Sequence, residues 1–301
     1  MQYLWLFLYV LSNVVLTLHN KFMLNQFDYP WLLTALHAFI TYVGVSLQHK
    51  PTQISKKDWK TIYYFSCLYT VNIAVSNWSL LLTSVHFHQI IRSSTPFVTV
   101  VLNLFYKKYT PWTKLMALIP VVVGVMLSTS GEVNYTLFGF ILVWFGVVLS
   151  ALKGIITNQV MVGPLKLHPM DALIKLCPLA TAQCLFIAVL NGEIYALLND
   201  PPSTVLVVSL FMNGFIAYLL NVASFTANKL NGPLTMTVAG NLKQVVTIVL
   251  SVVIFSAVIT PVNGIGIVLT LFGGILYSWT DFLTKKFQYL PVYQKQKTSV
   301  E

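Results

Sequence analysis

Two positively charged residues, Arg92 and Lys243, fall inside apolar stretches long enough to cross a lipid bilayer. A charge at the centre of a bilayer costs about 2.5–3.5 kcal/mol on insertion scales, so such residues generally serve a function. All eight acidic residues fall in predicted loops or at span ends, where none can pair with either cation. A buried cation without a carboxylate needs an anion from elsewhere. Phosphate suits both the forked guanidinium and the ammonium, so these residues predict a phosphate-binding site.

Polar side chains accompany both cations along one face of each predicted helix. A helix repeats every 3.6 residues, which gathers the polar residues of 86–106 into one stripe and those of 232–256 into another. The substrate-binding residues that we predict are Arg92, Thr95, Thr99, Asn103, Asn241, Lys243, Gln244 and Thr247, together with Asn20, Lys21 and Asn221. Arg92 and Lys243 are expected to hold phosphate oxygens, and the neutral side chains to contact sugar or base.

Simpler roles exist for the charged residues. A buried lysine or arginine can bond to helix-end carbonyls or extend to the headgroups, and Lys21 falls near a predicted span end. Lys153 and Lys175 lie in two further spans, where each either faces a cavity or reaches the membrane surface.

Neutral polar residues are equally open to two interpretations. Ser76, Asn77 and Asn221 either line a cavity or form hydrogen bonds between helices. His86 and His88 have no carboxylate or further histidine near them in the sequence. We therefore predict no metal site, no other cofactor and no catalytic residue.

The composition of the chain requires a membrane to surround these residues. The 301 residues are 56% hydrophobic and 9% charged, whereas about 25% charged is typical of soluble domains. Spans of about 20–24 residues leave only short loops between them. We expect an all-α membrane protein, a single transporter domain over residues 1–301. Ten transmembrane helices are predicted at residues 3–23, 30–48, 60–82, 86–106, 112–129, 136–160, 171–191, 203–227, 232–256 and 262–283.

The lysines set the expected orientation. Thirteen lysines fall on the face that holds both termini, whereas Lys21 alone falls on the opposite face. Positive loops remain in the cytosol, so both termini are expected there, with 285–301 as a cytosolic tail. The net charge of +10 is thus explained by membrane orientation, and the bilayer rather than nucleic acid is the expected partner.

An internal repeat predicts how the helices are arranged. Phe105, Thr110, Pro111 and Gly124 recur 150 residues later as Phe255, Thr260, Pro261 and Gly274. Because each half holds an odd number of spans, the second half (about 136–284) is inserted upside down relative to the first (about 1–130). Two inverted five-helix repeats are typical of secondary transporters, whose site lies at the midplane between the halves.

Four stretches, residues 20–38, 84–102, 173–185 and 232–255, resemble the triose-phosphate translocator and nucleotide-sugar transporter family of the drug/metabolite transporter superfamily. The resemblance implies the drug/metabolite transporter fold and exchange of an organic phosphate against a smaller phosphate species. It assigns phosphate binding to Lys243 and Arg92, and it matches Lys21 to a family lysine near the end of the first helix. Plastid members carry Lys-Arg where this chain has Lys243-Gln244, which disfavours triose phosphate or inorganic phosphate as the preferred substrate.

We therefore predict an antiporter of the Golgi or endoplasmic reticulum that exchanges a nucleotide sugar for a nucleoside monophosphate, as a single chain or a homodimer. One alternative is a translocator that exchanges a sugar phosphate, triose phosphate or phosphoenolpyruvate for phosphate. Another is an integral-membrane enzyme acting on lipid-linked phosphates, but this would need a general base or metal-binding acids at depth. A membrane adaptor without transport activity is a third, although the short loops offer little docking surface.

Overall fold

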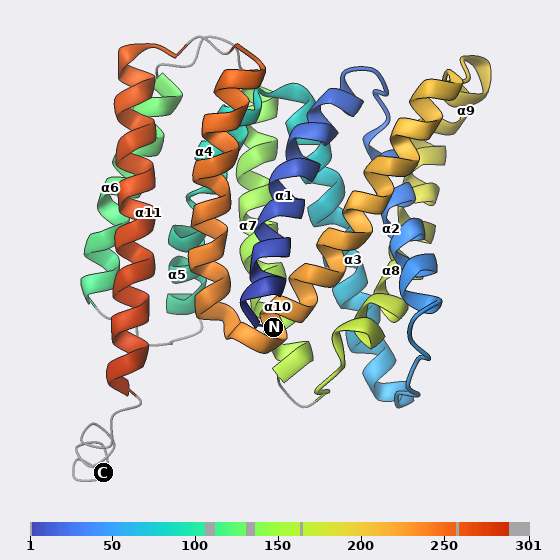
Figure 1. Ribbon diagram of the computed structural model, residues 1–301, viewed down its shortest axis with the longest axis horizontal. Helices are drawn as coiled ribbons and strands as arrows, with labels where there is room; N and C mark the ends of the chain where they lie inside the picture. The colour runs from blue at the N-terminus through green and yellow to red at the C-terminus, as the bar shows by residue number, and fades with distance from the viewer. Residues whose placement is uncertain (1, 106–111, 131–135, 163–164, 257–258, 289–301) are drawn as a thin grey trace.

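The computed structural model describes residues 2–105, 112–130, 136–162, 165–256 and 259–288, which form helices joined by short connections (Figure 1). No strand occurs in these ranges. The helices are α1 (Gln2–Leu24), α2 (Pro30–Ser46), α3 (Lys56–Leu82), α4 (Val85–Arg92), α5 (Thr95–Phe105), α6 (Trp112–Ser130), α7 (Leu137–Val162), α8 (Pro169–Leu190), α9 (Glu193–Asn199), α10 (Thr204–Ile254) and α11 (Pro261–Gln288).

Length and apolar composition make this an integral membrane protein. Five helical stretches are long and apolar enough to cross a bilayer, and they belong to α1, α3, α7, α8 and the first part of α10. Shorter apolar helices lie in α2, α6, the end of α10 and α11. The predicted all-helical membrane class is confirmed, and seven predicted spans each correspond to a single helix with ends within five residues of the prediction.

The predicted helix over 86–106 is wrong as a single element, because it breaks into α4 and α5 at Ser93 and Ser94. Pro96 lacks an amide hydrogen, and its ring would clash with the carbonyl of Arg92 in an unbroken helix. The Thr95 hydroxyl instead donates to that carbonyl oxygen at 2.6 Å. Arg92 thereby becomes the last residue of a short helix rather than a mid-helix residue.

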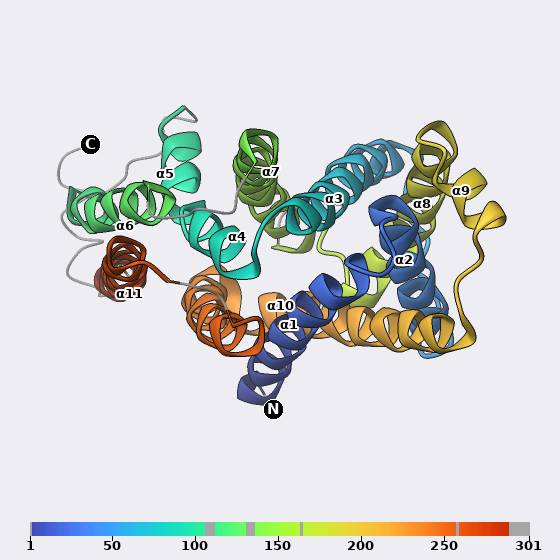
Figure 2. The same cartoon turned by 90° about the horizontal axis from the view of Figure 1, so that it is seen from above.

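The predicted spans 203–227 and 232–256 were expected as two separate helices, whereas the structure joins them in the 51-residue helix α10. The helical backbone continues through Gly232 and Pro233, but the helix is sharply bent (Figure 1). A proline inside a helix removes one backbone hydrogen bond and favours such a kink. The two arms of α10 therefore run in different directions, and α1 packs along them (Figure 2).

Three helix pairs account for the most extensive packing: α6 with α11, α1 with α10, and α2 with α8. The α6–α11 pair stands at one edge of the molecule in both views (Figures 1 and 2). Glycines allow the close approach, because a Cβ atom added to Gly124 would lie 2.4 Å from the backbone nitrogen of Thr270. A Cβ atom added to Gly266 would likewise lie 2.4 Å from the backbone nitrogen of Ser128.

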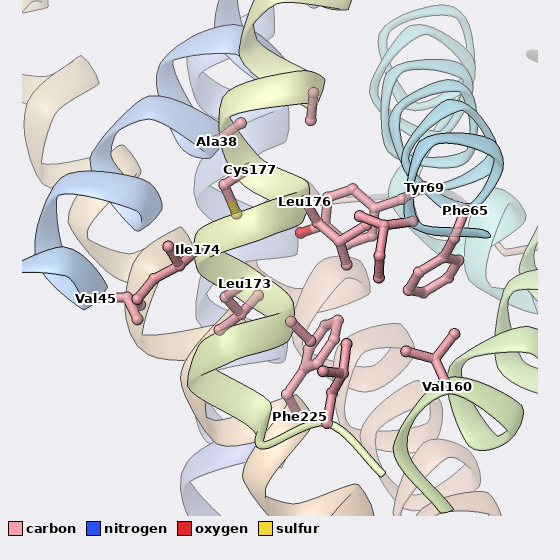
Figure 3. Close-up of a cluster of buried hydrophobic side chains, with 14 of the residues drawn as sticks. Ala38, Val45, Phe65, Tyr69, Val160, Leu173, Ile174, Leu176, Cys177 and Phe225 are labelled. Carbon is pink, nitrogen blue, oxygen red and sulfur yellow. The ribbon is translucent and has the colours of Figure 1, made fainter. Parts of the chain in front are cut away.

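A buried cluster joins α2, α3, α7, α8 and α10 (Figure 3). Phe65 and Tyr69 of α3 lie in it beside Leu176 of α8 and Phe225 of α10, each at most 4% exposed. Burying a large apolar side chain stabilises a fold by about 1.5–3 kcal/mol relative to water, and a smaller gain is expected where the reference is lipid. The cluster fixes the ring of Tyr69, which also borders the cavity described next.

The short helix α9 was not predicted, and it holds the buried acid Glu193. The Glu193 carboxylate accepts hydrogen bonds from the backbone amides of Trp31 at 3.3 Å and Leu32 at 2.9 Å. These amides open α2 and have no partner within the helix. Burial raises the pKa of Glu193, an effect that the two amide hydrogen bonds reduce.

Candidate functional site

A cavity of about 340 Å³ lies among α1, α2, α3, α4, α7, α8 and α10. Three cations line it, namely Arg92, Lys153 and Lys243. Its neutral polar lining residues are Asn13, Thr17, Asn20, Thr34, His37, Thr70, Asn72, Ser76, Asn77, His88, Gln89, Ser150, Thr157, Asn221, Ser224 and Asn228. Among the described residues that line the cavity, none is aspartate or glutamate. The cavity therefore favours an anionic ligand that can also form many hydrogen bonds.

Arg92 reaches the cavity because α4 ends there. Its Nη1 donates to the Ser76 hydroxyl on α3 at 2.8 Å, and its Nη2 donates to the Ser150 hydroxyl on α7 at 3.4 Å. Two neutral hydroxyls orient the planar group but carry no charge to neutralise it. A guanidinium has five N–H donors, so donors remain for a ligand.

Lys243 enters from the second arm of α10. Its Nζ lies 5.5 Å from the centre of the Tyr9 ring on α1. Such a cation–π contact contributes about 0.5–2 kcal/mol and does not use the N–H donors of the ammonium. Lys243 thus retains its hydrogen-bonding capacity in the cavity.

Lys153 and Lys175 were left with the same two interpretations by the sequence, and the structure separates them. Lys153 of α7 lines the cavity, with its Nζ 4.5 Å from the centre of the Tyr69 ring. Lys175 of α8 instead donates to the carbonyl of Thr52 at 2.8 Å and lies 3.8 Å from a carboxylate oxygen of Asp171. The second lysine is therefore engaged away from the cavity.

Lys21, predicted to bind substrate, is occupied by the protein and is not among the residues lining the cavity. Its ammonium donates to the carbonyls of Leu80, Leu81 and Thr83 at 2.8–3.0 Å. These carbonyls end α3 and lack partners within the helix. In this conformation Lys21 joins α1 to the end of α3.

The predicted neutral residues divide into two groups. Asn20 and Asn221 line the cavity, as do Ser76 and Asn77. The residues outside the lining are Thr95, Thr99, Gln244 and Thr247. The three threonines donate to carbonyls of the preceding turn, at 2.6–2.8 Å. Helical threonines commonly satisfy their hydroxyls in this way. The side chains of Asn103 and Asn241 lie outside the part of the chain that the structure describes.

The sequence did not predict a chain of hydrogen bonds that runs along the cavity. Its members are His19, His37, Asn213, Asn20, Asn77 and Thr34, drawn from α1, α2, α3 and α10. The Asn213 amide donates to Asn20 at 2.9 Å, and the Asn20 amide donates to Asn77 at 3.0 Å. Asparagines within apolar spans were the available signal, but which of them meet depends on how the helices pack.

The pattern of the Triose-phosphate Transporter family matches residues 1–278. The chain belongs to the Triose-phosphate Transporter family. Members of this family are transporters, so this chain is a transporter and not an enzyme, as predicted. The alternative of an enzyme acting on lipid-linked phosphates is thereby removed.

Relatives of this transporter occur in Arabidopsis thaliana. GDP-mannose transporter GONST5 is 29% identical, over 92% of this chain and 84% of the relative. The probable sugar phosphate/phosphate translocator At5g05820 is 31% identical, over 89% of this chain and 91% of the relative. UDP-galactose transporter 1 is 29% identical, over 89% of this chain and 83% of the relative. A protein of known crystal structure shares 13% identity with a TM-score of 0.62, covering 95% of this chain and 98% of its own, and it has the same fold.

Proposed function

We propose that this transporter exchanges a nucleotide sugar for a nucleoside monophosphate across an endomembrane, in the Golgi or the endoplasmic reticulum. One observation carries the proposal: Arg92 and Lys243 meet in a cavity whose described lining contains no acid. The names of two relatives, a GDP-mannose transporter and a UDP-galactose transporter, support the substrate class. The cavity's many amides and hydroxyls suit a ligand with a sugar and a base as well as phosphate.

In this proposal Arg92 of α4 and Lys243 of α10, two helices that pack against each other, clamp phosphate oxygens in the cavity. Asn20 and Asn221 contact sugar or base. The predicted residues outside the described lining, which are Lys21, Thr95, Thr99, Gln244 and Thr247, contact the substrate only in a different conformation of the transporter. Asn103 and Asn241 are also proposed to contact sugar or base.

Obligate exchange follows from charge. Like charges in a low-dielectric cavity repel one another and oppose closure while the cavity is empty. A bound phosphate neutralises them and allows the two halves to rock around the site. The return step needs an anion for the same reason, so net transport in one direction is slow.

The proposed architecture is a single domain of ten spans in two inverted repeats, about 1–130 and 136–284, with both termini and the tail 285–301 in the cytosol. In it, α4 and α5 form one discontinuous span, and the arms of α10 form two. The packing of α2 on α8 and of α6 on α11 supports it, because each pair consists of helices at equivalent places in the two proposed halves.

The test measures uptake of a nucleotide sugar into proteoliposomes that are loaded with a nucleoside monophosphate. Arg92→Ala and Lys243→Ala should each weaken exchange by about 10- to 100-fold, which corresponds to one hydrogen bond to a charged group. Lys60→Ala is the control, because it removes a lysine from the exposed start of α3. Normal exchange by both cavity variants would reject the phosphate clamp.

The second candidate, a sugar phosphate translocator, is favoured by the relative At5g05820. Competition between counter-substrates separates the two. A nucleotide-sugar antiporter should be inhibited by GMP or UMP and little affected by inorganic phosphate. The reverse order would favour the second candidate.

A further inference from the structure

The cavity holds a third cation, Lys153, for which one phosphate group provides no counter-charge. Lys153 lies three residues after Ser150 on α7, and residues so spaced share a helix face. Because Ser150 accepts a hydrogen bond from Arg92, the Lys153 side chain stands on the α7 face that Arg92 contacts. Lys153 is thus part of the same cationic surface as Arg92.

Lys153 also differs in its surroundings from Lys21 and Lys175, two other lysines of the predicted spans. Lys21 and Lys175 donate to backbone carbonyls, and Lys175 has a carboxylate beside it. Within the described part of the chain, the Lys153 ammonium has neither a carbonyl nor a carboxylate partner, and its contact is the face of Tyr69. The contact leaves its three N–H donors for a ligand.

The Tyr69 platform under Lys153 is rigid. The ring is 1% exposed within the buried cluster of Figure 3, and its hydroxyl donates to Asn221 at 2.9 Å. Asn221 in turn donates to Thr41 at 3.1 Å. A lysine on a fixed aromatic face loses less freedom on binding than one on an exposed helix, so Lys153 is preorganised for an anion.

We propose that Lys153 binds a second phosphate group, so that the transporter prefers compounds with two phosphate groups over compounds with one. The inference rests on the proposed function, in which Arg92 and Lys243 hold the first phosphate. A third positive charge left unpaired in a low-dielectric cavity is costly. A diphosphate supplies the missing negative charge, whereas a monophosphate leaves Lys153 without a partner. Lys153 is therefore a specificity-determining residue.

The experiment measures binding of GMP and GDP, and of inorganic phosphate and pyrophosphate, by inhibition of exchange and by thermal stabilisation of the full chain. Wild-type protein should bind each diphosphate at least tenfold more tightly than its monophosphate, as expected of one more charge-assisted contact. Lys153→Met should remove most of that ratio and leave monophosphate binding within about threefold. Lys153→Arg should retain it, and Lys60→Met, at the exposed start of α3, should leave it unchanged.

Equal binding of mono- and diphosphates by the wild-type protein would overturn the inference without any variant. Equal loss of both probes in Lys153→Met would also overturn it, because a general charge effect does not discriminate between them. Failure of the proposed function looks different: wild-type protein would then bind neither nucleotide. The phosphate and pyrophosphate pair still reports on Lys153 if the base is not recognised.

Discussion

The close contact between α6 and α11 predicts that one methyl group at Gly124 separates the two helices. A Cβ atom at Gly124 would lie 2.4 Å from both the backbone nitrogen and the hydroxyl oxygen of Thr270, and 2.7 Å from the carbonyl oxygen of Gly266. Ordinary contacts of this kind are about 3.5 Å or longer. Two of these atoms belong to the backbone, so a side-chain rotation cannot relieve the overlap.

Two effects of opposite sign set the magnitude. Replacing glycine by alanine inside a helix is stabilising by about 1 kcal/mol. Overpacking a tight interface costs about 1–3 kcal/mol, and occasionally more when backbone must move. For Gly124→Ala we expect a net loss of about 2 kcal/mol in the free energy of unfolding, because the clash involves backbone. At Gly146 the nearest atom would lie 3.7 Å away, so Gly146→Ala carries the propensity gain without the clash.

The assay compares unfolding of the two purified variants in the same detergent, by heat and by denaturant titration. Gly124→Ala should unfold before the wild-type protein, and Gly146→Ala at or after it. Gly266→Ala should resemble Gly124→Ala, since its Cβ would lie 2.4 Å from the backbone nitrogen of Ser128. The two destabilising changes should not add, because either one separates the same helices. Equal stability of Gly124→Ala and Gly146→Ala would refute the predicted contact.

Two further predictions concern residues outside the cavity lining. Lys21→Met should lower the free energy of unfolding by about 1–3 kcal/mol, since the carbonyls at the end of α3 lose their donor. It should also raise KM, because Lys21 is proposed to contact the substrate in another conformation; an unchanged KM would remove Lys21 from the proposed site, and unchanged stability would contradict its role at the end of α3. Burial raises the pKa of Glu193 above its usual value near 4.5, so the folded state holds that proton more tightly than the unfolded state. Its stabilising contribution is full below pH 4.5 and is lost as the pH rises through the folded-state pKa. The pH dependence of the melting temperature should therefore flatten in Glu193→Gln, and an identical profile in both proteins would contradict this.

The position of most helices could be predicted from the sequence, because a helix in a membrane satisfies its own backbone hydrogen bonds locally. Apolar length and flanking charge then locate its ends, as for α1, α2 and α8. The two places where the predicted spans and the helices differ, the break between α4 and α5 and the continuous α10, each contain a proline, Pro96 and Pro233. A helix that contains a proline can break, bend or continue, and what packs beside the proline decides which of these occurs. The local sequence therefore could not show that the chain breaks before Pro96 but continues through Pro233.

The sequence alone determined that this chain is a helical membrane protein with buried cations and few acids to pair them, because composition and spacing suffice for that conclusion. Only the tertiary structure decided which polar groups meet. Lys153 and Lys175 look alike in the sequence, yet one faces the cavity and the other meets Asp171. Helix rotation and packing settle such choices through contacts between residues far apart in the chain, and no local pattern records them.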